Sequence, residues 1–93
     1  MIGDRQRIDR WLWNARVVRT RNAAAALVTA GNVRLNGVRV TAPGRDLKLG
    51  DVLTISLYAR VRVLKVTALT PRRGDASAAS LLYDELIEKP SPA

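Results

Sequence analysis

Apolar residues recur at helical spacing in two neighbouring stretches near the beginning of the chain. The first stretch predicts a helix over residues 8–18, with a buried face formed by Ile8, Trp11, Leu12, Ala15 and Val18. A second helix is predicted over residues 20–30, because Thr20 is a good N-cap and Gly31 suits the left-handed position after a helix end. The connection through Arg19 is very short, so the two helices are expected to lie side by side.

After Gly31 the pattern changes to alternation. Asn36-Gly37 stands between two alternating runs and predicts a β-hairpin over residues 33–40, because both turn positions require positive φ. Arg34 and Arg39 are expected to face outward. The side chains expected on the buried side are Val33, Leu35, Val38 and Val40. Further along, Leu47 and Leu49 are expected to return to the core before a turn at Gly50-Asp51.

The second half of the chain predicts two longer strands and one helix. Residues 52–57 alternate, a turn is expected at 58–60, and residues 61–69 form the next strand. A shift of the apolar phase within 61–69 predicts a β-bulge. A last helix is predicted from Asp75, and residues 89–93 are expected to form a frayed tail. The face predicted for that helix carries Ala79, Leu82, Tyr83 and Leu86.

Together these elements predict an α+β fold. Two N-terminal helices are expected to pack on a small, mostly antiparallel sheet, with a short C-terminal helix. A chain of 93 residues is long enough for one small domain, so residues 1–93 are expected to form a single domain.

Positive charge is concentrated in the first half of the chain. In residues 1–50, ten Arg and Lys stand against three Asp, whereas in residues 51–93 six stand against five Asp and Glu. Thirteen of the sixteen cations are Arg, whose planar fork of donors fits phosphate oxygens and base edges. Solubility alone does not require clustered arginine, so the distribution indicates a nucleic-acid partner.

Several classes of function are disfavoured by residues that the sequence does not contain. There is no Cys, which excludes a thiolate site, and no His, which is the most common general base and metal ligand. We therefore predict no catalytic residue, no metal site and no cofactor. No stretch approaches the roughly 18 apolar residues of a transmembrane helix, and the N-terminus does not have the pattern of a signal peptide. A cytoplasmic protein is expected.

The cations gather around the ends of the predicted helices and on the hairpin. Arg5 lies with others at the start of the first helix, while the second helix begins with free backbone N–H groups that favour phosphate. A rigid surface of this kind suits structured RNA, which proteins grip by its phosphates and 2′-hydroxyls. The predicted RNA-binding residues are Arg7, Arg10, Arg16, Arg19, Thr20, Arg21, Asn22, Arg34, Asn36, Arg39 and Lys48.

Some of these residues have simpler structural roles as well. Thr20 is first a helix cap, and Asn36 is first a turn residue. Trp11 lies on the apolar face and is predicted to be buried in the core. Trp13 lies off that face, so two alternatives stay open: it stacks on a base, or it packs against the hairpin or the C-terminal segment.

The order of these motifs resembles the RNA-binding domain family named after ribosomal small-subunit protein four. The resemblance covers about residues 7–57, from Ile8-Asp9 through Thr20-Arg21 and the segment 31–40 to Gly50-Asp51. The resemblance implies RNA contact at nine of the predicted positions: Arg7, Arg10, Arg19, Thr20, Arg21, Arg34, Asn36, Arg39 and, as the weakest candidate, Lys48. Arg16 and Asn22 are predicted from charge and helix position alone. The C-terminal strand and helix over 61–87 would complete the domain.

Three features resemble the ribosome-associated heat-shock branch of this family: the Arg10–Trp13 segment, Thr20-Arg21, and Arg72-Arg73 followed by residues 81–83. That resemblance implies a non-catalytic protein that grips ribosomal RNA on large ribosomal subunits still holding a peptidyl-tRNA. The alternatives are an RNA-binding regulator or assembly factor, an accessory module of an RNA-modifying enzyme, and a general DNA-coating protein.

Overall fold

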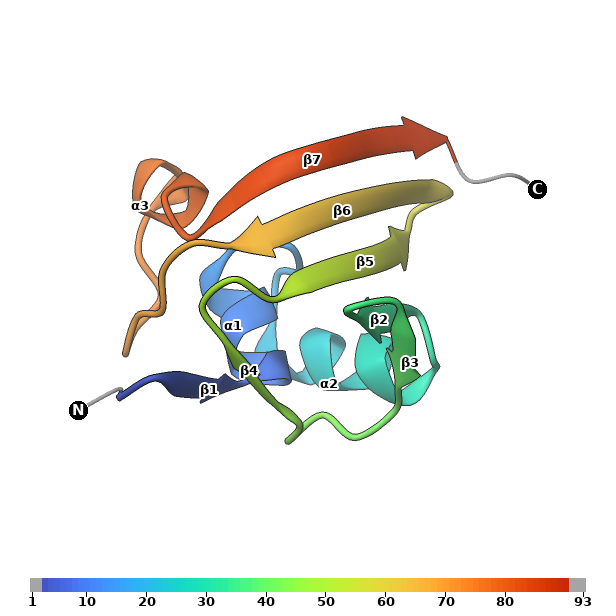
Figure 1. Ribbon diagram of the computed structural model, residues 1–93, viewed down its shortest axis with the longest axis horizontal. Coiled ribbons are helices and arrows are strands. Elements are labelled where there is room, and N and C mark those ends of the chain that lie inside the picture. Colours follow the sequence, from blue (N-terminus) through green and yellow to red (C-terminus); the bar gives the residue numbers. More distant parts are fainter. Residues whose placement is uncertain (1–2, 91–93) are drawn as a thin grey trace.

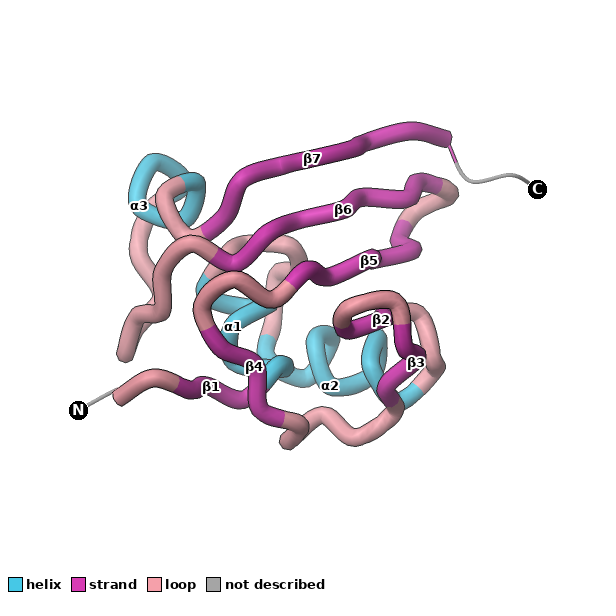
Figure 2. Tube along the Cα trace, in the orientation of Figure 1, coloured by secondary structure: helices cyan, strands magenta, loops and turns pink. Residues whose placement is uncertain are grey.

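Five antiparallel strands form the main sheet of the protein, which we describe from a computed structural model over residues 3–90. The strand order is β3-β2-β5-β6-β7, and a separate two-stranded ribbon joins β1 to β4 (Figures 1 and 2). The α+β prediction is confirmed. The elements in chain order are β1 (Arg5–Arg7), α1 (Ile8–Asn14), α2 (Arg21–Thr29), β2 (Val33–Leu35), β3 (Val38–Val40), β4 (Asp46–Lys48), β5 (Val52–Leu57), β6 (Arg60–Val66), α3 (Ala76–Ser80) and β7 (Tyr83–Pro90).

One hydrophobic core joins both N-terminal helices to the sheet. In Figure 1, α2 lies between α1 and the β2–β3 hairpin. Trp11 of α1 and Leu53 of β5 are fully buried in the same cluster, so the prediction that Trp11 belongs to the core is confirmed. Leu47 is buried as expected, but Leu49 is 56% exposed, because β4 ends at Lys48 and the chain turns there.

α1 is shorter than predicted and ends at Asn14 rather than at residue 18. Arg16 takes a φ of 59°, which stops the helix. The amide of Val17 donates to the Leu12 carbonyl at 3.1 Å and the amide of Arg16 to the Trp13 carbonyl at 3.1 Å, so the end is a Schellman motif. Glycine usually fills that left-handed position, and its absence made this helix end hard to predict.

The ends of α2 agree with prediction. The Thr20 hydroxyl accepts a hydrogen bond from the Ala23 amide at 3.0 Å, and Gly31 has a φ of 82°. The hairpin after it also forms as predicted, with Asn36 and Gly37 both at positive φ. Val38 was expected to be buried but is 67% exposed, because it lies beside the turn on an edge strand.

The C-terminal region departs most from the sequence-based prediction. Asp75 caps α3 by accepting from the Ala78 amide at 2.8 Å, but the helix ends at Ser80 and Tyr83–Pro90 is a strand. Two residues of the expected frayed tail therefore belong to β7, and residues 91–93 lie outside the described range. The irregularity in pairing involves Leu86 of β7, opposite Val63 and Leu64, whereas β6 pairs with β5 without a register break.

Candidate nucleic-acid interface

Exposed cations border the N-terminal end of α2. Arg19 and Arg21 are exposed, and within residues 3–90 neither side chain has a hydrogen bond or ion pair. The amides of Arg21 and Asn22 lie in the first turn, where an α-helix has no internal acceptor for them. The Thr20 hydroxyl already accepts the capping hydrogen bond from the Ala23 amide. This end of α2 therefore presents two free guanidinium groups beside N–H groups that favour a phosphate.

The other end of α2 meets a second pair of arginines on the hairpin. Arg34 and Arg39 are directly opposite each other across β2 and β3, and both are exposed. The Arg39 side chain runs past Gly31, where a Cβ atom would lie 3.3 Å from its Cδ. Arg39 thus extends along the C-terminal end of α2. Like charges opposite each other repel, so an anion bound between these two arginines would stabilise the pair.

Small residues line the exposed side of α2 between these two ends. Asn22, Ala26 and Thr29 are exposed and follow one another at helical spacing. A nine-residue helix is about 13 Å long, which separates the two arginine pairs by the span of a few phosphates. We call Arg19, Arg21, Arg34 and Arg39, with the exposed side of α2, the α2 surface.

Three of the predicted arginines are held by groups of the protein itself. Arg7 binds the buried Asp9 carboxylate through two hydrogen bonds of 3.1 and 2.9 Å, and these bonds raise the pKa of Arg7. Arg10 donates to the Pro71 carbonyl, and Arg16 to the Gly74 carbonyl at 2.9 Å. These three arginines fix the segment around α1, so they are less available to RNA than those of the α2 surface.

Asn36 is also held inside the protein. Its Nδ2 donates to the buried Asp51 at 3.1 Å, and its Oδ1 accepts from the Val52 amide at 2.9 Å. Both polar atoms of the side chain are therefore engaged. Asn36 fixes the hairpin turn to the start of β5 and thereby sets the position of Arg34 and Arg39.

The structure places Trp13 against the C-terminal segment. The Arg73 guanidinium lies over the indole ring at 5.6 Å from its centroid, and its Nε donates to the Trp13 carbonyl at 3.0 Å. Of the alternatives left open by the sequence, packing against that segment is the one observed. The cation–π contact covers a ring face that a base would need.

Arg45 and Lys48 lie in a different place, next to β1. Lys48 is directly opposite Arg5 across the β1–β4 ribbon, and Arg45 precedes β4. Sequence reasoning missed Arg45, because only the pairing of β1 with β4 brings it near Arg5. A pocket between the ribbon and the hairpin turn is lined by all three cations.

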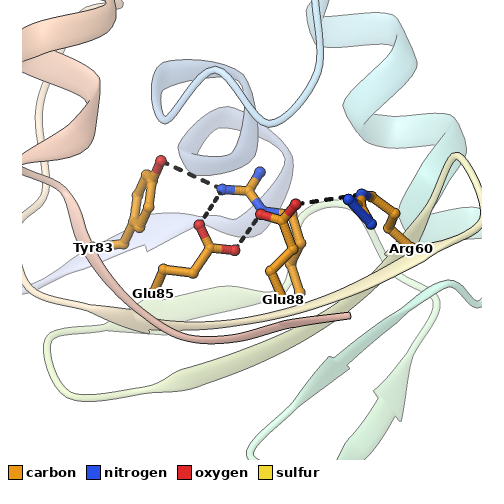
Figure 3. A network of polar contacts seen from close by, with 5 residues as sticks. Arg60, Tyr83, Glu85 and Glu88 are labelled. Atoms are coloured by element: carbon orange, nitrogen blue, oxygen red, sulfur yellow. Dashed lines mark hydrogen bonds and ion pairs between the residues drawn. The ribbon is translucent and has the colours of Figure 1, made fainter. Parts of the chain in front are cut away.

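Two cations of β6, Arg60 and Arg62, are in contrast neutralised by β7, whereas Lys65 of the same strand has no ion pair within residues 3–90. Arg62 donates to both carboxylate oxygens of Glu85, at 2.7 and 2.8 Å, and Arg60 pairs with Glu88 at 3.4 Å (Figure 3). Glu85 holds the pKa of Arg62 above its usual value, and Arg62 lowers the pKa of Glu85. The unpaired positive charge of the protein therefore lies mainly in its first half.

Metal ligands do not gather anywhere in residues 3–90, where His, Cys, Asp and Glu form no group of three that could hold an ion. In the same range, no helix is both long and apolar enough to cross a membrane. The chemistry that the exposed arginines of the α2 surface offer is the binding of anions.

Comparisons with known proteins identify relatives of this architecture. Residues 6–53 match the S4 domain family. Heat shock protein 15 of Escherichia coli K12 is 39% identical over 82 residues, which are 88% of this chain and 61% of that protein. Small ribosomal subunit protein uS4 of Methylobacterium radiotolerans is 33% identical over 63 residues, 68% of this chain and 31% of that protein.

A solved structure agrees with the sequence relatives. Trimeric heat shock protein 15 of Vibrio cholerae superposes with a TM-score of 0.80 at 30% identity, covering 88% of this chain and 82% of that one. The chain spans about three fifths of the length of the curated heat shock relatives that it matches.

Proposed function

The chain belongs to the S4 domain family, and from this premise we propose that it binds structured RNA through the α2 surface. The observation that carries the proposal is the position of four exposed arginines at the two ends of one helix, Arg19, Arg21, Arg34 and Arg39, none of which has an ion pair within residues 3–90. An RNA backbone lying along α2 would meet small residues in the middle and guanidinium groups at both ends. Such a grip depends on phosphate spacing and needs no catalytic group.

The RNA we propose is ribosomal RNA of the large subunit. Similarity to heat shock protein 15 and to the ribosomal protein uS4 supports a ribosomal partner. Resemblance to the heat-shock branch of the family further favours large subunits that hold a peptidyl-tRNA after stalled synthesis. The protein would act there as a binding factor in recycling.

Charge reversal at one end of α2 tests the binding surface. Arg19→Glu combined with Arg21→Glu should abolish binding to purified large-subunit ribosomal RNA in a gel-shift assay at physiological salt. Both side chains are exposed, so the melting temperature should change little. Lys65→Glu, which reverses one charge at an exposed position of β6, is the matched control for the single variant Arg21→Glu. A plot of the logarithm of the binding constant against the logarithm of the salt concentration has a slope set by the number of phosphate contacts. Arg21→Glu should reduce this slope by the equivalent of about one contact, whereas Lys65→Glu should not change it. Retained binding by the double variant would place the interface elsewhere.

Two comparisons test the identity of the partner. Wild-type protein should bind the ribosomal RNA more tightly than duplex DNA of equal length at the same salt; equal affinity would indicate general nucleic-acid binding. In a sedimentation assay, the protein should pellet with isolated large subunits more than with small subunits, and most with large subunits carrying peptidyl-tRNA. Equal pelleting with both subunits would reject the recycling role while leaving RNA binding intact.

A further inference from the structure

A pocket of about 430 Å³ opens between the β1–β4 ribbon and the hairpin turn, and none of the four arginines of the α2 surface lines it. Its volume lies in the range of small-ligand sites, about 300–1,000 Å³. The lining includes three cations, one exposed acid and the end of β2: Arg5, Arg45, Lys48, Asp46, Leu35 and Asn36.

Within residues 3–90, none of the three cationic side chains of this pocket donates a hydrogen bond to a carboxylate. Arg5 and Lys48 are directly opposite each other in an antiparallel pair, an arrangement that like charges destabilise. The one acid within 4.0 Å of Arg5 is Asp4, at 3.9 Å, and the two side chains are 70% and 90% exposed, so the contact is loose. Neither Arg45 nor Lys48 has an ion pair within residues 3–90. A phosphate in the pocket would be stabilised by all three side chains.

The acids of the pocket differ in what they can still accept. Asp51 is buried and already accepts from the Asn36 side chain and, at 2.9 Å, from the Lys48 amide. Asp46 is exposed and accepts no side-chain hydrogen bond within residues 3–90, and Arg7 opposite it is engaged by Asp9. A free carboxylate can accept two parallel N–H donors. Among the RNA bases, guanine presents two neighbouring N–H groups on its pairing edge.

The pocket walls are held in place before any ligand binds. Asp51 joins the hairpin turn to β4 through Asn36 and Lys48, and the amide of Val52 binds Asn36. Leu35 is 7% exposed and belongs to the core, so only a small apolar part of the pocket wall comes from it, enough for the edge of a base to touch. A preformed wall reduces the entropy that binding costs.

We propose that this pocket receives one unpaired guanosine nucleotide of the bound RNA. Its phosphate lies among Arg5, Arg45 and Lys48, and its base lies against the pocket wall beside Leu35 with its pairing edge on Asp46. The inference rests on the proposed RNA-binding function and adds to it the recognition of a base. Unpaired nucleotides are the parts of RNA whose bases proteins can reach directly.

Titration of 5′-GMP into the isotope-labelled protein tests the pocket itself. The NMR amide signals of Arg5, Asn36, Arg45 and Lys48 should shift on binding. Guanosine, inorganic phosphate and 5′-AMP should each bind about tenfold more weakly, since each lacks one charge-assisted or paired contact. Arg45→Ala should weaken GMP binding about tenfold, while Lys65→Ala, with the same charge change, should alter it less than twofold. Asp46→Asn should remove the preference for GMP over AMP.

The contrary results of this titration are equally specific. Amide shifts centred on Arg21 and Arg39, or no amide shifts at all, would contradict the proposal that the pocket is the binding site. Equal binding of GMP and inorganic phosphate would contradict the claim that the pocket binds a nucleotide rather than phosphate alone. Equal binding of GMP and AMP would contradict the recognition of guanine.

A pair of hairpin RNAs, one with a single bulged G and one without it, tests the source of the nucleotide. Wild-type protein should prefer the bulged RNA several-fold, and Arg45→Ala should bind both equally. If GMP enters the pocket but the wild type does not distinguish the two RNAs, the ligand is a free nucleotide and the proposal is wrong. Arg19→Glu with Arg21→Glu should weaken both RNAs alike. If the wild type shows no preference for the bulged RNA but the double variant still binds both RNAs more weakly, the pocket alone is refuted. If the wild type prefers the bulged RNA but the double variant binds both RNAs as tightly as the wild type, the α2 surface alone is refuted.

Discussion

Replacing Arg62 by Met should destabilise the protein by a measurable and predictable amount. The guanidinium makes two charge-assisted hydrogen bonds to Glu85 and lies 5.7 Å from the centroid of the Tyr83 ring. The Arg62 and Glu85 side chains are 24% and 29% exposed, so the pair is neither a surface ion pair nor a fully buried one. Methionine retains the apolar stem that packs on the sheet and removes the charge.

The expected magnitude follows from these exposures. Exposed ion pairs contribute about 0.2–1 kcal/mol, whereas breaking a buried pair costs about 3–5 kcal/mol. Glu85 can regain water when Arg62 is lost, so we expect the lower part of this interval, about 1.5 kcal/mol. For a domain of this size, such a loss lowers the melting temperature by roughly 6–12 °C.

A double-mutant cycle separates the ion pair from packing. Urea unfolding of wild type, Arg62→Met, Glu85→Gln and the double variant should yield a coupling free energy of about 1 kcal/mol, with unchanged m-values. A coupling below about 0.3 kcal/mol would show that pairing with Glu85 contributes little to stability, and the reasoning would be refuted.

The same pair predicts a dependence on pH. Hydrogen bonds from Arg62 lower the pKa of Glu85 in the folded protein. The stabilisation is therefore complete above the unfolded-state pKa of Glu85 and is lost as the pH falls through its lower folded-state pKa. The difference in unfolding free energy between wild type and Glu85→Gln should shrink in acid and stay constant around neutral pH. A constant difference down to strongly acid pH would contradict this sign.

Two further substitutions test local structure. Asn36→Ala removes both hydrogen bonds to the start of β5 and places alanine at a φ of 52°, so it should cost about 2 kcal/mol in thermal unfolding; Asn36→Gly relieves the backbone and should cost less. Thr20→Ala removes the cap of α2 and should cost about 1 kcal/mol by urea unfolding, whereas Thr20→Ser, which retains the hydroxyl, should be nearly neutral.

The parts of the fold that the sequence predicted well are those decided by neighbouring residues. Thr20 marks the start of α2 because its hydroxyl accepts from an amide three positions away. Gly31 marks the end of α2 and Asn36-Gly37 the hairpin turn, because these residues take the positive φ that each position requires. The end of α1 follows the same rules, but Arg16 occupies the left-handed position. Nothing in the residue type announces that choice.

β7 was missed because its conformation depends on a distant strand. Residues 79–86 have apolar spacing that also fits a helix, and the local pattern favours it. Pairing with β6 overrides the pattern: Tyr83 pairs with Val66, and Glu85 reaches Arg62. Strand formation here is a property of the two segments together, so neither segment alone predicts it.

The sequence indicated which cations belong to the candidate site. It did not indicate which of them are held by groups of the protein and which stay exposed. Arg10 and Arg16 resemble Arg19 and Arg21 in sequence, yet the first two donate to backbone carbonyls about sixty positions away, at Pro71 and Gly74. Those carbonyls carry no charge pattern that the sequence could reveal. Within residues 3–90, the segment over residues 68–74 therefore holds Arg10 and Arg16 beside α1, whereas Arg19 and Arg21, which are similar in sequence, have no such acceptor and stay exposed.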